Sequence, residues 1–303
     1  MDYEKFEKET KKTGPSPLEK IQRVTKRKRQ NRILNILLVV FILIFLVSAG
    51  CLAWYYIGIH KNEKKTESAK KMILDEDDIQ KKIGETPSDE VKIEVLPDGR
   101  EQKFLIINGQ MVLAKYADIY RKYPDFIGWL MIPGTNIDYP VMQTMGDEEY
   151  YLRRDIDGNY NTAGTLFLDT AGNASIPTDN NIIYGHNMKA GTMFHSLPDY
   201  ADEDFYKEHK TFYFDTIFGE GTYEIIAAFR TEVQDEGAEG FRYYEFFQAE
   251  NEEDFDSYVE NVKKLTPYQI DTTATYGDKL VTLSTCSYHT DEGRFVVVGK
   301  RVY

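Results

Sequence analysis

The sequence predicts a mainly β domain with inserted helices, preceded by a single membrane-spanning helix. Residues 36–59 form an uncharged apolar run of 24 residues near the N-terminus. From about residue 91 onward, short β-branched and aromatic runs alternate with Gly, Pro, Asn and Asp, a pattern typical of a β-barrel. With 303 residues and 42% hydrophobic side chains, the chain is long enough to bury a substantial core.

Charge is distributed unevenly along the chain. Of 37 basic and 50 acidic side chains, 11 basic and 5 acidic lie in residues 1–32, which leaves 26 basic and 45 acidic in the rest. The body of the protein is therefore strongly acidic. We expect no nucleic-acid partner for it, because phosphate backbones are bound by basic surfaces.

The N-terminal segments predict membrane topology. Residues 1–32 carry a basic cluster, and 33–59 are predicted to be a transmembrane anchor with Trp54, Tyr55 and Tyr56 at its far end. Because the basic flank is N-terminal, residues 1–32 are expected in the cytoplasm and the rest outside. A cleaved signal peptide is the alternative, but the apolar run is long and starts far from Met1.

The remaining chain divides into a spacer and one domain. Residues 60–90 are charged and poor in aromatics, which favours an extracellular stalk with one helix near 72–82. The folded domain is predicted over 91–303. Strands are expected at 91–96, 103–107, 127–132, 137–141, 165–169, 181–185, 211–214 and 222–229, and helical segments at 112–123, 193–200, 203–209 and 252–265.

The last element is predicted to be a β-hairpin. Residues 280–285 and 295–298 are apolar runs, and the segment between them contains Asp, Glu and Gly. This hairpin places Cys286 and Arg294 at the same end of two paired strands. A fixed positive charge favours a thiolate, and a guanidinium can donate hydrogen bonds to an oxyanion.

A cysteine nucleophile generally needs a histidine brought near by the fold. Cys51 lies in the apolar run, so Cys286 is a lone thiol in the domain. Of the histidines in the domain, His186 follows a predicted strand and is the best candidate. His195 is expected to be packed within a helix, and His209 is expected to be solvated. His289 lies in the predicted hairpin loop, three residues from Cys286.

Three separated segments resemble the sortase family. Residues 282–286, TLSTC, resemble its TLxTC signature, with Arg294 eight residues later. Residues 181–186, NIIYGH, resemble the histidine segment of the family, and 128–141, GWLMIPGTNIDYPV, resemble its early strands. The helical segments at 112–123 and 252–265, together with the N-terminal anchor, resemble class B.

The resemblance implies a closed eight-stranded sortase-type barrel and a cysteine transpeptidase of the thiol peptidase type. Cys286 would be the nucleophile, His186 the general acid and base, and Arg294 the oxyanion donor. The enzyme would cleave an LPxTG- or NPxTN-like signal of a secreted protein after Thr. It would then transfer the thioacyl group to an amine of a peptidoglycan precursor or a pilin, at the outer face of a Gram-positive-type membrane.

Substrate contacts are assigned to three residues. Ser284 shares a strand face with Cys286, Thr285 adjoins it, and Leu152 resembles a class B groove position. Some class B enzymes carry an acidic residue directly after the cysteine region, whereas Ser287 follows here. No carboxylate is therefore given a catalytic role, and no cofactor or resident metal is expected.

Three alternatives stay open at this point. One is another extracellular cysteine enzyme, such as a wall peptidase or an L,D-transpeptidase. A second is a membrane-tethered binding domain with a degenerate site. A third is a metal site formed by His186, His195, His289 and Cys286, although no second paired ligand motif accompanies them.

Overall fold

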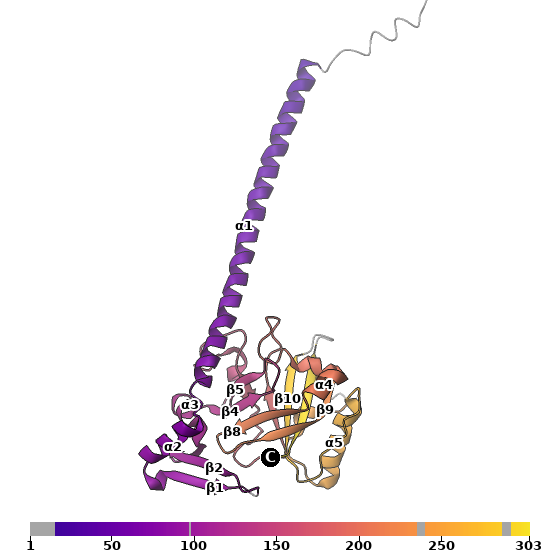
Figure 1. The fold of residues 1–303 in the computed structure, drawn as a ribbon. Helices are drawn as coiled ribbons and strands as arrows, with labels where there is room; N and C mark the ends of the chain where they lie inside the picture. The colour runs from indigo at the N-terminus through magenta and orange to yellow at the C-terminus, as the bar shows by residue number, and fades with distance from the viewer. Residues whose placement is uncertain (1–15, 97, 235–239, 287–291) are drawn as a thin grey trace, which may run out of the picture. The chain divides into compact units, whose positions relative to one another are not determined.

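The computed structural model describes residues 16–96, 98–234, 240–286 and 292–303. The chain divides into two units, residues 1–56 and residues 57–303. Helix α1 (Pro17–Lys70) begins in the first unit and ends in the second. Figure 1 labels the helices and strands of the second unit.

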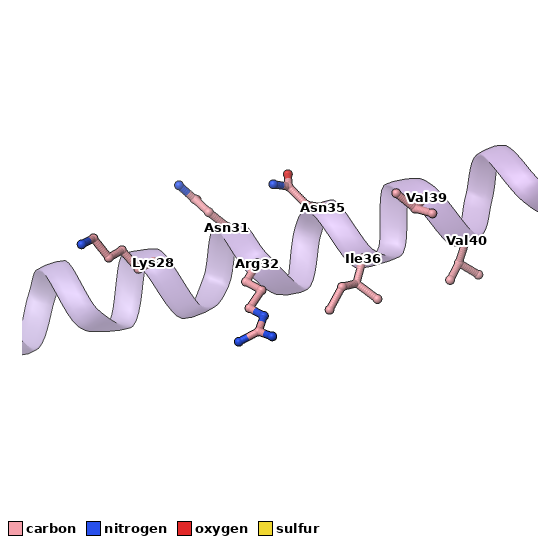
Figure 2. A pocket seen from close by; sticks show the side chains of 7 residues that line it. All are labelled: Lys28, Asn31, Arg32, Asn35, Ile36, Val39 and Val40. Atoms are coloured by element: carbon pink, nitrogen blue, oxygen red, sulfur yellow. The ribbon is translucent and has the colours of Figure 1, made fainter.

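In its described part, the first unit is helix α1 alone. Lys28 and Arg32 lie before Ile36, Val39 and Val40 on this helix, so that charge gives way to apolar side chains (Figure 2). A stretch of α1 is long and apolar enough to cross a membrane, and its large aliphatic side chains are exposed. Exposure of so many apolar side chains suits a lipid environment.

The last turns of α1 pack within the second unit. Asn62 is buried and donates from Nδ2 to the Gly164 carbonyl at 3.0 Å. Lys65 pairs with Asp155 at 2.7 Å and with Asp157 at 2.6 Å. Where the sequence predicts a spacer over 60–90, α1 continues and is followed by α2 (Glu76–Glu85) and the turn η2 (Ser88–Glu90).

A three-stranded antiparallel sheet comes next, in the order β1 (Val91–Val95), β2 (Glu101–Ile107) and β3 (Gln110–Leu113). Asn108 and Gly109 connect β2 to β3 with φ of 53° and 80°. Positive φ at both central residues is the geometry of a two-residue type I′ hairpin turn.

The prediction of a helix over 112–123 is wrong for its first residues. Val112 pairs with Leu105 and Leu113 with Phe104, so the segment begins as a strand. The helix α3 covers only Ala117–Lys122, after the turn η3 (Ala114–Tyr116). The Asn-Gly turn, together with burial of both apolar side chains against β2, outweighs the helical spacing of the sequence.

Eight strands form a closed barrel in the order β10-β11-β9-β8-β4-β5-β6-β7. β10 with β7 and β5 with β6 pair in parallel, and the other neighbours are antiparallel. The strands are β4 (Phe126–Met131), β5 (Asp138–Met142), β6 (Leu166–Leu168), β7 (Asn180–Tyr184), β8 (Thr211–Thr216), β9 (Thr222–Glu232), β10 (Leu280–Cys286) and β11 (Gly293–Arg301). The predicted fold class is thus confirmed, with strand ends shifted by a few residues.

Short helices occupy the connections. They are η4 (Tyr150–Arg153), η5 (Leu197–Ala201), α4 (Glu203–Glu208), η6 (Tyr243–Glu245) and α5 (Glu252–Leu265). Helix α5 has the predicted bounds, and the side chain of the preceding residue Asn251 caps it by accepting from the Asp254 amide. The helix buries Phe255, Tyr258 and Val262 in a cluster with side chains of β9 and β11. Residues 193–200, expected to be helical, contain only part of the η5 turn.

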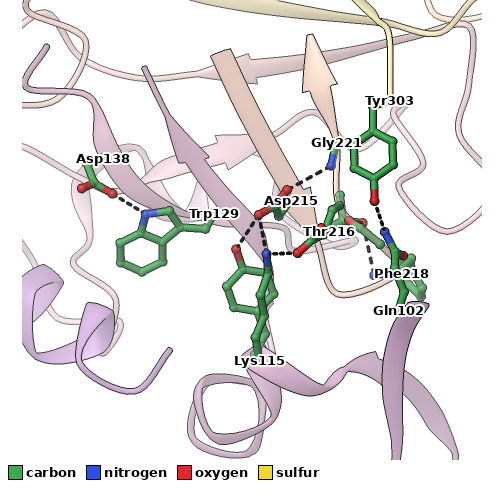
Figure 3. Close-up of polar contacts among 12 residues, drawn as sticks. Gln102, Lys115, Trp129, Asp138, Asp215, Thr216, Phe218, Gly221 and Tyr303 are labelled. Atoms are coloured by element: carbon green, nitrogen blue, oxygen red, sulfur yellow. Dashed lines mark hydrogen bonds and ion pairs between the residues drawn. The ribbon is translucent and has the colours of Figure 1, made fainter. Parts of the chain in front are cut away.

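A polar cluster joins the segment before α3 to the barrel. Lys115 Nζ lies 2.7 Å from Asp215 and 2.6 Å from Glu220, and the Tyr116 hydroxyl donates to Asp215 at 3.3 Å. Asp215 also accepts from the Gly221 amide (Figure 3). Lys115 is the cation in contact with both carboxylates, so the attachment of this segment depends on it.

We predict that Lys115→Met lowers the free energy of unfolding by about 2 kcal/mol, because two partly buried carboxylates lose their counter-ion. Thermal and chemical unfolding of the full chain in detergent would measure this. Lys207→Met is the matched control, since Lys207 pairs with Glu203 and Asp204 at the exposed surface of α4. The control is expected to change stability by less than about 0.5 kcal/mol, and equal losses in both variants would contradict the prediction.

Candidate active site

The C-terminal hairpin brings Cys286 and Arg294 together. Strands β10 and β11 are antiparallel, and Cys286 is the direct partner of Arg294 in their register. Directly opposed residues of an antiparallel pair have Cβ atoms about 5 Å apart on one face of the sheet. The thiol and the guanidinium therefore lie at the same end of the hairpin, as the sequence predicts.

Strand β7 brings His186 to the same end of the barrel. It runs parallel to β10, with Tyr184 paired to Ser284. His186 follows Tyr184 by two residues, and Cys286 follows Ser284 by two. Both side chains thus emerge where two neighbouring parallel strands end.

Gly185 permits close packing just before His186. A Cβ atom at this position would lie 2.3 Å from Leu166 Cδ2 and 2.8 Å from Phe194 Cδ2. Both neighbours are fully buried. A larger residue would push the strand end, and His186 with it, away from its present position.

Cys286, His186 and Arg294 line one cavity of about 540 Å³. This volume is in the range of small-ligand sites. The cavity is also lined by Glu148, Glu149, Leu152, Phe167, Tyr184, Gly185, Val233, Tyr243, Tyr244, Ser284 and Thr285. All six residues that the sequence singles out for the site therefore lie at one cavity.

The His186 ring is held by a backbone carbonyl. Its Nε2 lies 2.8 Å from the Leu152 oxygen, which can only accept, so Nε2 carries the proton and Nδ1 is the basic nitrogen of the neutral ring. Burial lowers the pKa of His186; the bond to Leu152 raises it in part, and the charge of Arg153 lowers it further. The net effect favours the neutral imidazole.

Arg294 keeps its positive charge at the cavity wall. One Nη donates to the Gly293 carbonyl at 3.1 Å, and the other lies 3.8 Å from the exposed carboxylate of Glu292. An ion pair at this length in contact with solvent neutralises little charge. The guanidinium can therefore interact with a negative charge that develops near Cys286.

The neighbours of Cys286 on β10 have hydroxyls that are already bonded. Ser284 Oγ lies 2.7 Å from the Tyr243 hydroxyl, and Thr285 Oγ1 donates to the Gly185 carbonyl at 2.7 Å. Both residues are buried. Substrate contact by Ser284, Thr285 and Leu152 stays a prediction.

The other histidines differ in position. His195 is exposed and contacts Asn187, and His209 bonds the Pro133 carbonyl and packs on Phe205; neither lines the cavity. His289 lies outside the described residues, as do Ser287 and Asp291. Within the part of the chain that the structure describes, no group of three or more His, Cys, Asp or Glu side chains is placed to hold a metal ion.

Sequence reasoning missed several residues of the cavity wall. Tyr243 and Tyr244 come from the turn η6 in the connection between β9 and α5, where no element was predicted. Two adjacent tyrosines in an otherwise polar connection were the sequence feature that could have indicated a contact with the site. Glu148 also lines the cavity; burial raises the pKa of its carboxyl, and the nearby Asp169 raises it further.

Comparison with known proteins agrees with this geometry. The family model for the sortase domain matches residues 130–302. Sortase B of Listeria monocytogenes is 35% identical over 198 residues, which cover 65% of this chain and 77% of that protein. The residues at the cavity, His186, Cys286 and Arg294, all lie in the matched range.

Solved structures give the same result for the fold. Sortase B from B. anthracis in complex with AAEK1 has a TM-score of 0.62 at 26% identity, covering 82% of this chain and 99% of that one. A sortase B complexed with triglycine has a TM-score of 0.56 at 29% identity, covering 62% and 85%. This chain therefore belongs to the sortase family of cysteine transpeptidases, and its relatives are class B sortases.

Proposed function

We propose that this protein is a membrane-anchored sortase that cleaves a sorting signal of a secreted protein and joins the acyl part to an amine. The observation that carries the proposal is the convergence of Cys286, His186 and Arg294 on one cavity. The hairpin of β10 and β11 delivers a thiol and a guanidinium to that cavity, and β7, which is distant in sequence, leads to the imidazole. Acyl transfer through a thioester uses a nucleophile, a general acid and base, and a donor to the oxyanion, and these three groups can supply them.

The first half-reaction forms a thioester. His186 takes the Cys286 proton, and the thiolate attacks the backbone carbonyl carbon of the signal's threonine. The carbonyl oxygen becomes negative and is stabilised by Arg294. When the C–N bond breaks, the imidazolium returns its proton to the departing amine, which leaves the acyl group on sulfur.

The second half-reaction transfers the acyl group. A neutral amine attacks the thioester carbonyl, His186 accepts the proton that this amine loses, and the sulfur leaves and regains a proton. The acceptor is an amine of a peptidoglycan precursor or of a pilin. Binding of triglycine by a related sortase B supports an acceptor of this type, because that peptide begins with a free amine.

Helix α1 supports the proposed anchoring and orientation. Its apolar stretch supports a membrane span over residues 33–59, with lipid as a partner of the exposed side chains. The basic cluster before the span supports a cytoplasmic N-terminus. The barrel then lies outside the cell membrane, within reach of secreted proteins and wall precursors.

The signal itself is proposed to be of LPxTG or NPxTN type. Leu152, Ser284 and Thr285 line the cavity and are proposed to contact it. The full chain in detergent would be incubated with fluorogenic peptides of both types, with and without triglycine. A joined product that depends on triglycine supports a transferase; hydrolysis alone, or no turnover in a folded protein with a reactive thiol, would favour a peptidase or a degenerate binding domain.

We predict that Cys286→Ala lowers turnover of the cleaved peptide by at least about a thousandfold, because the covalent route loses its nucleophile. The variant should unfold at the same temperature as the parent. Cys51→Ala is the matched control and should retain full turnover, since Cys51 lies in the apolar stretch of α1. Residual turnover of the Cys286 variant above a tenth of the parent would refute the assignment.

We predict that Arg294→Lys lowers kcat/KM by roughly a hundredfold, because a lysine ammonium cannot reproduce the guanidinium fork at the developing oxyanion. Arg301→Lys on the same strand is the control. Its guanidinium donates to the Tyr303 and Glu220 carbonyls, away from the cavity, and its loss should leave kcat/KM within about twofold. Equal activity of the two variants would remove Arg294 from the mechanism.

We predict that His186 titrates below the ordinary histidine pKa of about 6.5, because burial disfavours the imidazolium. The ring therefore stays neutral at pH 6.5 and gains its proton only at lower pH. The titration would be followed by NMR in the Cys286→Ala variant, where no thiolate is coupled to the ring, and assigned through His186→Gln. A midpoint at or above 6.5 would contradict the prediction.

A further inference from the structure

The backbone ladder between β7 and β10 ends just before the reacting side chains. Its last paired residues are Tyr184 and Ser284, and the Gly185 amide still donates to the Ser284 carbonyl at 3.2 Å. Two side-chain bonds continue the connection beyond that point. Thr285 Oγ1 donates to the Gly185 carbonyl at 2.7 Å, and Asn187 Nδ2 donates to the Cys286 carbonyl at 3.3 Å.

These two bonds are made by the residues on either side of His186 in the sequence. The residue before it is tied to Thr285, and the residue after it is tied to Cys286 itself. Asn187 is also fixed through its backbone, which pairs with Met193, while the Phe194 amide donates to the His186 carbonyl at 2.9 Å. The segment that follows His186 is thus closed on itself and attached to the end of β10.

The Asn187 carboxamide has a defined orientation. The Cys286 carbonyl can only accept, so it must face the NH₂ end of the amide. Oδ1 then faces His195 Nδ1 at 3.3 Å, and that nitrogen must carry a proton to donate. The amide therefore links an exposed histidine to the backbone of Cys286.

Asn187 differs from the residues that line the cavity. His186 lines it and Asn187 does not, as neighbouring side chains of an extended segment point to opposite sides. Its side chain contacts the backbone of Cys286 and the ring of His195. Through these contacts Asn187 can affect the reaction by placing Cys286 and His186.

We propose that Asn187 is a positioning residue that holds the His186 segment against the carbonyl of Cys286, with His195 orienting its carboxamide. The proposal rests on the proposed function in that Cys286 and His186 are the pair that exchanges a proton. A displacement of about 1 Å between reacting groups can lower a rate by about a hundredfold. Loss of this one side-chain hydrogen bond can therefore lower the reaction rate more than it lowers the stability of the fold.

The test is Asn187→Ala in the full chain in detergent. We expect kcat for peptide cleavage to fall about ten- to a hundredfold while KM changes by less than about twofold, because the reacting pair and not the substrate contacts is displaced. Asn161→Ala is the matched control. Its Nδ2 donates to the Gly58 carbonyl at 2.9 Å and its Oδ1 accepts from the Ala163 amide at 2.9 Å, and Asn161 does not line the cavity, so kcat per folded molecule should be unchanged.

A second readout does not require a peptide. The rate of Cys286 alkylation by iodoacetamide would be measured against pH by mass spectrometry of the Cys286-containing peptide. Among the described residues, the charged or titratable groups near the pair are Arg153, Arg294, Glu148, Glu149, Glu292 and His195, and both variants retain them. We therefore expect a shifted profile in Asn187→Ala and the parent profile in Asn161→Ala.

The contribution of His195 is tested by two substitutions. His195→Gln keeps a donor for the Asn187 oxygen and should retain kcat within about twofold, whereas His195→Phe removes it and should lower kcat several-fold. Equal kcat in these two variants would overturn the role of His195. Parent values of kcat and of the alkylation profile in Asn187→Ala would overturn the whole proposal. If the parent cleaves no peptide, the proposed function fails, and the alkylation profile still decides the role of Asn187.

Discussion

The parallel pairing of β7 with β10 is the interaction on which the candidate site depends. It joins two strands that are far apart in the sequence and aligns Tyr184 with Ser284, so that His186 and Cys286 emerge side by side. The antiparallel partner β11 then adds Arg294 from the other side of β10. Because β10 is buried along almost its whole length, a shift by one residue would turn Cys286 away from the cavity and separate the buried hydroxyls of Thr282 and Ser284 from their partners.

Closure of the barrel gives this register its stability. Each of the eight strands has two neighbours, and α5 covers part of the outer surface through Phe255 and Tyr258. Tyr258 also contacts Thr282, which donates to the buried Asn180, so side-chain bonds connect the covering helix, β10 and β7. The cavity lies where these strands end and the backbone ladder gives way to side-chain contacts, a place where functional groups can be presented without breaking the sheet.

Much of this arrangement could be predicted from local sequence. The apolar runs around a polar turn define the final hairpin, and its length places Cys286 opposite Arg294. The parallel register of β7 could not be derived locally, since nothing near His186 specifies a partner strand. The resemblance to a family supplied only the expectation that His186 acts together with Cys286. Prediction from local sequence failed at Val112, where helical spacing and a hairpin turn indicate different structures. The Asn108-Gly109 turn pairs this segment with β2, so that it is a strand and not a helix. Tyr243 and Asn187 escaped notice because irregular connections have no periodicity that predicts contacts.

The central claim is that Cys286 becomes acylated by a sorting signal, and trapping the intermediate tests it most directly. The full chain would be mixed with an LPxTG or NPxTN peptide without an acceptor amine, quenched in acid, digested and examined by mass spectrometry. We expect a thioester on the Cys286-containing peptide, with the mass of the signal up to its threonine. This adduct should disappear when triglycine is added before the quench. An acyl adduct on another residue, or product formation with Cys286 unmodified at every time point, would contradict it.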